Sequence, residues 1–75
     1  NMVDKYLNTN DLECPLPLLK TKLSLSSLNS GEILEVSATD PTSWEDFPIY
    51  AKISGNKLIY AEKEGNFFIY RIKRK

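Results

Sequence analysis

The chain contains no histidine and only one cysteine, Cys14, among its 75 residues. Without histidine it cannot build a Cys–His pair for acyl transfer, and it cannot form the usual structural zinc sites, which combine cysteines and histidines. A single cysteine cannot form a disulfide within the chain or cycle as a CxxC pair. The glycine-rich nucleotide-binding motifs GxxxxGKS/T and GxGxxG are also missing. We therefore expect no metal ion and no other cofactor.

Long apolar runs are also absent. No segment approaches the roughly 20 apolar residues of a membrane span, and the N-terminus lacks the pattern of a signal peptide. Small secreted domains usually contain several disulfides, so a lone cysteine favours a reducing compartment. These absences predict a cytoplasmic protein that does not enter a membrane.

Net charge is absent too, because ten basic residues balance ten acidic ones. No overall field attracts nucleic acid, although the basic C-terminal segment "RIKRK" contrasts with acidic residues at Asp40, Glu45 and Asp46. Such a basic end is usually solvated. In the alternative interpretation, the basic segment contacts phosphates and nearby aromatic side chains stack on bases. These aromatic residues are Tyr60, Phe67, Phe68 and Tyr70. The zero net charge argues against direct nucleic-acid binding.

The local patterns predict one domain spanning residues 1–75. Residues 2–9 are a candidate strand. Pro15 and Pro17 fit the first turn of a helix, for which Gly31 is a candidate C-terminal stop. Residues 32–38 alternate as a half-buried strand does.

Further along the chain, a second helix is predicted from Phe47 to Ser54, with Asp46 as its N-cap, Pro48 in its first turn and Gly55 at its end. Residues 57–63 and 66–73 are typical of a β-hairpin around "EGN". The predicted order is β-α-β-α-β-β. Because each helix must bury an apolar stripe, we expect an α+β fold, a two-layer α/β sandwich with two helices on one face of a four-stranded mixed sheet.

The leucines of the first helix do not form one face. Leu16, Leu19 and Leu23 share one side, whereas Leu18 and Leu25 lie seven residues apart on roughly the opposite side. We therefore expect part of this leucine content at the surface.

The position of Cys14 suggests a chemistry. A lone cysteine is usually an inert, buried hydrophobe, but the two prolines favour a residue held at or next to the helix N-cap. There the helix dipole and unpaired N–H groups favour the thiolate, while the adjacent Glu13 opposes it. A reactive sulfur without a base or second thiol can accept a sulfur atom as a persulfide and pass it on.

Three segments are similar to one protein family. "CPLP" at 14–17, "GEILEVSATDP" at 31–41 and "DFPIYAKISGNKL" at 46–58 resemble the TusA/SirA family of sulfur carriers, in order and across nearly the whole chain. The resemblance implies the same β-α-β-α-β-β sandwich and a persulfide on Cys14. It also implies motif roles for Pro15 and Pro17, and a role in helix capping and shape for Asp46 and Pro48.

The resemblance further implies protein partners. The donor would be a cysteine desulfurase or a rhodanese-like protein, and the acceptor would lead to thiolation of tRNA or to a related sulfur pathway. The chain departs from the family pattern at Asn8, Asn10 and Asp11, where members commonly have an aspartate, an arginine-like residue and a glycine.

Two functions stay open from the sequence. The first is a sulfurtransferase-type carrier whose motif helix docks donor and acceptor, with candidate contacts at Leu18, Lys20, Lys22 and Leu25. The two leucines can equally well pack inside the domain. The second is a non-enzymatic interaction or regulatory module on the same fold that has lost sulfur-carrier activity.

Overall fold

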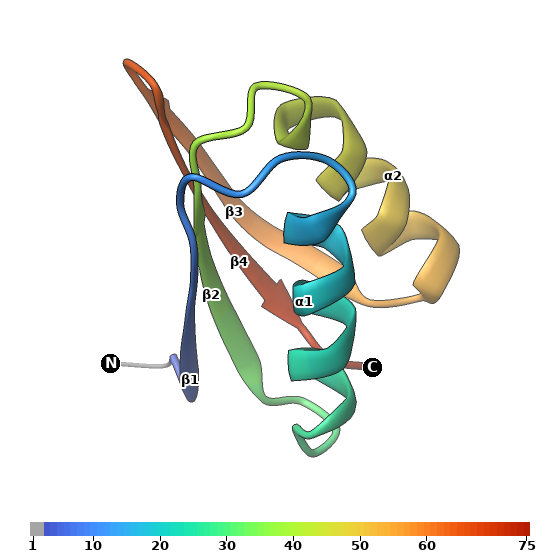
Figure 1. Cartoon of the computed structure of the whole chain (residues 1–75). Coiled ribbons are helices and arrows are strands. Elements are labelled where there is room, and N and C mark those ends of the chain that lie inside the picture. The colour runs from blue at the N-terminus through green and yellow to red at the C-terminus, as the bar shows by residue number, and fades with distance from the viewer. Residues whose placement is uncertain (1–2) are drawn as a thin grey trace.

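The computed structural model describes residues 3–75, which form the predicted β-α-β-α-β-β order (Figure 1). Met2, where the predicted first strand begins, lies outside the described residues. The elements are β1 (Lys5–Thr9), α1 (Leu16–Ser26), β2 (Ile33–Ala38), α2 (Ser43–Ser54), β3 (Lys57–Glu64) and β4 (Phe67–Lys73).

The four strands form one mixed sheet in the order β1-β2-β4-β3. β1 pairs with β2 in parallel, and the other two pairings are antiparallel. Both helices cover the same face of this sheet, as Figure 1 shows. The predicted two-layer α+β sandwich is therefore confirmed.

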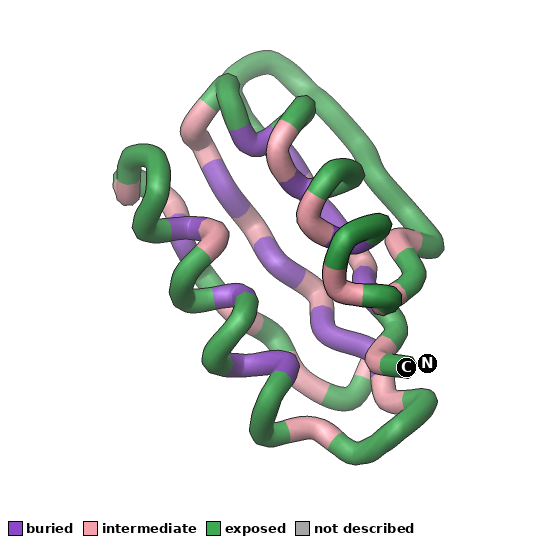
Figure 2. The backbone as a smooth tube through the Cα atoms, turned by 90° about the vertical axis from the view of Figure 1, so that its right-hand side faces the viewer, coloured by how far each residue is buried: buried purple, intermediate pink, exposed green. Residues whose placement is uncertain are grey.

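The core lies between the central strands and the helices. Leu34, Val36 and Ala38 of β2 are fully buried, and in Figure 2 the buried positions follow the central strands behind the helices. α2 contributes Phe47, whose ring stacks on that of Tyr70 with 4.3 Å between centroids. Hydrophobic burial of this kind is the main favourable term in folding, and it holds both helices on the sheet.

The first helix differs from its prediction at both ends. Pro15 is the N-cap and Pro17 the second helical residue, so only Pro17 lies in the first turn, where both prolines were predicted. The helix ends at Ser26, well before Gly31. The hydroxyls of Ser26 and Ser27 donate to backbone carbonyls of the last turn, and serines that bond the backbone in this way favour helix ends.

The second helix begins four residues earlier than predicted. Its N-cap is Thr42 instead of Asp46, and Pro48 lies inside the helix. The Asp40 carboxylate organises this start, because it accepts hydrogen bonds from the Thr42 N–H (3.2 Å) and the Thr42 hydroxyl (2.7 Å). Gly55, in the left-handed conformation (φ 80°), ends the helix as predicted.

The predicted hairpin is confirmed, with β3 and β4 paired in antiparallel. It divides the four aromatics considered for nucleic-acid binding, because Phe68 and Tyr70 are buried in the core whereas Tyr60 and Phe67 are exposed. On the sheet face opposite the helices, the Arg71 guanidinium pairs with Glu35 (2.9 Å) and lies 4.6 Å from the Tyr60 ring centroid. The aromatics therefore do not form one stacking surface.

Alkaline pH is expected to destabilise the fold through Tyr70. Burial raises the pKa of Tyr70 above its ordinary value of 10.0, and its hydroxyl shares a 2.7 Å hydrogen bond with Ser43. The stabilisation that Tyr70 provides is complete below the unfolded pKa near 10 and is lost as the pH rises through the higher folded pKa. Urea unfolding measured between about pH 8 and about pH 11 should show this loss.

The control is Tyr70→Phe. At neutral pH it should be about 1 kcal/mol less stable, because the Ser43 hydroxyl loses its partner, but its stability should fall less steeply at alkaline pH. Burial also raises the pKa of Tyr50, so part of the slope should remain in the variant. Equal slopes in the two proteins would contradict the assignment to Tyr70.

Candidate functional site

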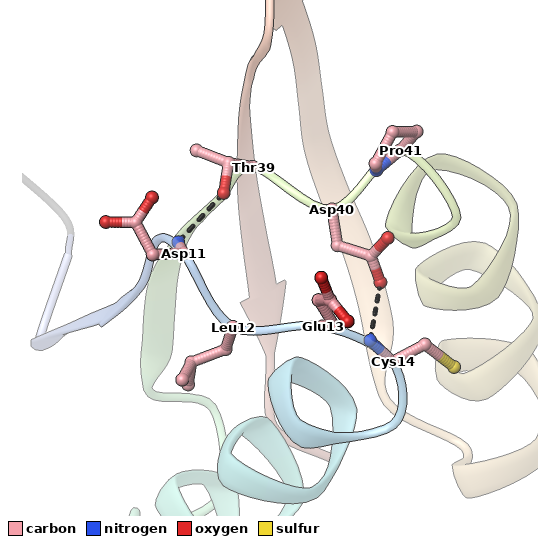
Figure 3. A pocket seen from close by; sticks show the side chains of 7 residues that line it. All are labelled: Asp11, Leu12, Glu13, Cys14, Thr39, Asp40 and Pro41. Carbon is pink, nitrogen blue, oxygen red and sulfur yellow. Dashed lines mark hydrogen bonds between the residues drawn. The ribbon is translucent and has the colours of Figure 1, made fainter.

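Cys14 lies where two loops meet at one edge of the sheet. Because β1 and β2 are parallel, their following loops leave the sheet at the same edge. The Asp11 N–H donates to the Thr39 hydroxyl (2.8 Å), and the Cys14 N–H donates to the Asp40 carboxylate (2.9 Å) (Figure 3). Two hydrogen bonds thus join the loop that carries the cysteine to the loop that begins α2.

The residues that depart from the family pattern shape the first of these loops. Asp11 has a left-handed backbone (φ 68°), a conformation that glycine adopts freely and that aspartate tolerates better than most residues. The Asn8 carboxamide oxygen accepts the Asn10 N–H (2.8 Å). The aspartate at position 11 is therefore compatible with the turn that leads to the cysteine.

The cysteine side chain is free and exposed. As predicted, Cys14 lies next to the helix N-cap, which is Pro15; the peptide bond between them is cis. Its Sγ lies 3.8 Å from Asp46 Oδ2, at hydrogen-bonding distance for a thiol. In Figure 3 the sulfur points away from the other side chains drawn, toward the side where Asp46 lies. Because Cys14 is exposed, a reactant can approach the sulfur from solvent.

Carboxylates surround this sulfur on both sides. An open pocket of about 500 Å³ adjoins it, lined by Asp11, Leu12, Glu13, Cys14, Thr39, Asp40 and Pro41. A second, narrow pocket reaches from the sulfur toward the core, lined by Cys14, Pro15, Pro17, Leu18, Asp40, Ser43, Asp46 and Phe47. No lysine or arginine lines either pocket, so the charge that faces a docking molecule here is negative.

Asp40 was not among the predicted site residues. Its carboxylate accepts hydrogen bonds from the Cys14 N–H and from the N–H and hydroxyl of Thr42, the N-cap residue of α2. One side chain therefore holds both the cysteine loop and the start of the helix. The sequence contained one indication of this role. Asp40 follows β2, and because β2 runs parallel to β1, the residues after both strands lie at the same edge of the sheet.

Of the other four predicted motif residues, three lie at the sulfur and one does not. Pro15, Pro17 and Asp46 line the narrow pocket with Cys14, whereas Pro48 is exposed on α2 and lines neither pocket at the sulfur. Asp46 is a neighbour of the sulfur in the first turn of α2, not a cap.

The four docking candidates on α1 differ in how far they are exposed. Lys20 and Lys22 are exposed and Leu18 is half-buried. Leu25 is 2% exposed and belongs to the core, so its predicted docking role is wrong. The exposed leucines of this helix are Leu16, Leu19 and Leu23, the side that the sequence grouped together.

Within residues 3–75, no three His, Cys, Asp or Glu side chains are grouped so as to hold a metal ion. Neither of the helices described there is long and apolar enough to cross a membrane.

Asp46→Asn is expected to make the thiol react faster. Two like unit charges about 4 Å apart repel each other by about 1 kcal/mol in water, so removing the carboxylate charge next to Sγ should raise the alkylation rate at neutral pH about fivefold. Iodoacetamide labelling followed by mass spectrometry measures this rate. Glu45→Gln is the matched control, because Glu45 is exposed on the same helix and lines neither pocket. Equal acceleration in both variants would refute a local effect.

Comparisons with known proteins agree on one family. The model of the family described as Sulfurtransferase TusA matches residues 5–74. The chain is 44% identical over 71 residues to the sulfur carrier protein TusA of Allochromatium vinosum, which covers 95% of this chain and 93% of that protein. It is 31% identical over 72 residues to the sulfur carrier protein TusA of Pseudomonas putida, covering 96% of this chain and 90% of that one.

A solved structure supports the fold. The crystal structure of a SirA-like protein from Desulfitobacterium hafniense superposes with a TM-score of 0.80. It is 21% identical in sequence, and the match covers 93% of this chain and 96% of that one. The architecture described above is therefore shared with this protein.

Proposed function

Because the chain belongs to the TusA sulfurtransferase family, we propose that it is a sulfur carrier that holds sulfur as a persulfide on Cys14. The observation that carries this proposal is the exposed, single thiol at the tip of the sheet. No second cysteine exists in the chain to discharge a persulfide as an internal disulfide.

The transfer needs only thiol chemistry. The Cys14 thiolate attacks the outer sulfur of a persulfide on the donor, the bond between the two donor sulfurs breaks, and the donor leaves as a thiolate. Cys14 then carries the outer sulfur. In the second step an acceptor thiolate attacks that sulfur and Cys14 leaves as a thiolate. Each step forms one S–S bond and breaks one, so no oxidant is consumed.

The site fits this exchange in two ways. The sulfur is exposed on a loop, so two large proteins can reach it in turn. The loop is held by the Asp40 hydrogen bond and by the rigid start of α1, so the sulfur keeps a defined position, and defined positions lower the entropic cost of a reaction.

The partners are proposed at the level of class. A cysteine desulfurase or a rhodanese-like protein would donate sulfur in the cytoplasm, and a sulfur-acceptor protein would take it toward tRNA thiolation or a related pathway. Lys20, Lys22 and the partly buried Leu18 on α1 are the candidate contacts for these proteins.

The second candidate function is the interaction module without carrier activity. One observation favours it: Asp11, at a position where family members commonly have glycine, adds a carboxylate to the open pocket at Cys14. The same loading experiment decides between the two functions.

The test incubates the purified chain with a cysteine desulfurase and cysteine, followed by intact mass spectrometry. We expect a gain of one sulfur atom, reversed by a reducing agent and located by digestion on the peptide that contains Cys14. A chain that stays at its unmodified mass while a known carrier is loaded in parallel would overturn the carrier proposal and favour the interaction module.

A further inference from the structure

A groove between α1 and α2 begins beside the sulfur. It measures about 210 Å³ and is lined by Pro15, Leu18, Leu19, Lys22 and Tyr50. Pro15 and Leu18 also line the narrow pocket that contains Cys14. The groove and the sulfur site are therefore neighbours on the surface, separated by no more than these two shared residues.

Both helices that form this groove carry exposed apolar side chains. Leu19 is 50% exposed on α1, and on α2 Ile49 and Ile53 are 56% and 80% exposed. Ile53 lies one helical turn after Ile49 and three residues after Tyr50, so these side chains share one side of α2. A contiguous exposed apolar surface of this kind marks a site of protein–protein contact.

The charge beside the groove restricts what can bind. Asp46 lies 3.8 Å from the sulfur, and Asp11, Glu13 and Asp40 line the open pocket at Cys14. No basic side chain lines the two pockets there, whereas Lys22 lines the groove itself. A second copy of this chain would bring the same carboxylates against them, and nucleic acid would bring phosphates, so both would meet like charge. A binding segment with lysine or arginine beside its own reactive sulfur would meet opposite charge.

We propose that the groove and the carboxylates together recognise one segment of a sulfur-exchanging protein. This segment places an apolar side chain between α1 and α2, and basic residues next to its reactive cysteine face the carboxylates around Cys14. The inference rests on the proposed carrier function, because it names the chemistry of the partner at the same sulfur.

Activated peptides provide the test. Each synthetic peptide contains one cysteine joined by a disulfide to 5-thio-2-nitrobenzoate. The Cys14 thiolate attacks the peptide sulfur, a protein–peptide disulfide forms, and the coloured thiolate leaves. The reference series has lysines beside the cysteine and one leucine at different distances from it. In a second series glutamates replace the lysines, and in a third alanine replaces the leucine.

We expect the lysine peptides to react about tenfold faster than the glutamate peptides at low salt, with a smaller difference at high salt. At the best distance, leucine should increase the rate severalfold over alanine, because the groove buries its apolar surface. The Leu19→Ser variant should lose the advantage of leucine over alanine. Leu23→Ser should keep it, since Leu23 is 70% exposed on the same helix but does not line the groove.

Two matched variants test the role of the carboxylates. Glu13→Gln should reduce the preference for lysine peptides, whereas Glu45→Gln should not, because Glu45 lies outside both pockets at the sulfur. All rates are normalised to reaction with iodoacetamide, an uncharged reagent, which reports the intrinsic reactivity of Cys14.

Three results would overturn the inference: equal rates for lysine and glutamate peptides, no effect of leucine at any distance, or the same loss in Leu23→Ser as in Leu19→Ser. A dimer in sedimentation that Leu19→Ser dissociates would assign the groove to a second copy instead. Peptide exchange needs no persulfide, so a chain that loads sulfur without peptide preference refutes only this inference. A chain with the preference that never loads sulfur refutes the carrier function.

Discussion

Cys14→Ser is expected to take up no sulfur from a cysteine desulfurase under conditions in which the wild-type chain is loaded. A serine hydroxyl does not form a persulfide, and the chain has no other thiol that could replace Cys14. The loss should therefore be complete instead of partial. Intact mass spectrometry over a time course of loading measures it.

The fold of this variant should remain intact. The Cys14 side chain is exposed, and substitutions at exposed positions usually change the free energy of unfolding by no more than about 0.5 kcal/mol. Urea unfolding of both proteins is the control. An equal gain of sulfur mass in Cys14→Ser would show that the sulfur is held elsewhere, and the persulfide assignment would fall.

Asp40→Ala is expected to affect both stability and loading. The carboxylate accepts hydrogen bonds from the Cys14 N–H, the Thr42 N–H and the Thr42 hydroxyl. Its loss should lower the free energy of unfolding by about 2 kcal/mol, because the N–H and hydroxyl of the N-cap residue Thr42 lose their acceptor and the cysteine loop loses its anchor. Loading should slow about tenfold, since a mobile loop presents the sulfur less often in the reactive position.

Thr42→Ala separates the two effects of Asp40. It removes the hydroxyl that bonds to Asp40 but leaves the hydrogen bond from the Cys14 N–H to the carboxylate. We expect this variant to lose stability and to load at the wild-type rate. If folded Asp40→Ala also loads at the wild-type rate, the positioning role of Asp40 is wrong.

The elements that the sequence predicted correctly depend on local patterns. The alternation of residues 32–38 identified the buried face of β2, because side chains on a strand alternate between two faces. The strand ends at Ala38, as that pattern does. Gly55 ended α2 as predicted, with a left-handed backbone that glycine adopts without strain. The prolines after Cys14 placed the cysteine next to the N-cap of α1. In each case the deciding residues lie within a few positions of one another.

The surroundings of the sulfur depend on the tertiary structure instead. Asp40 bonds to a residue 26 positions away, and Asp46 lies beside a sulfur 32 positions away. No local pattern links these residues. The burial of Leu25, on a helix whose leucines face both sides, was likewise decided by which side of α1 meets the sheet.

By itself, then, the sequence determined the order of the elements, the two-layer architecture and the presence of a single cysteine next to a helix start. Only the tertiary structure decided that this position is exposed, held by Asp40 and surrounded by carboxylates. The physical reason is the parallel pairing of β1 and β2. It brings the loops after both strands to one edge of the sheet, where their side chains meet around Cys14.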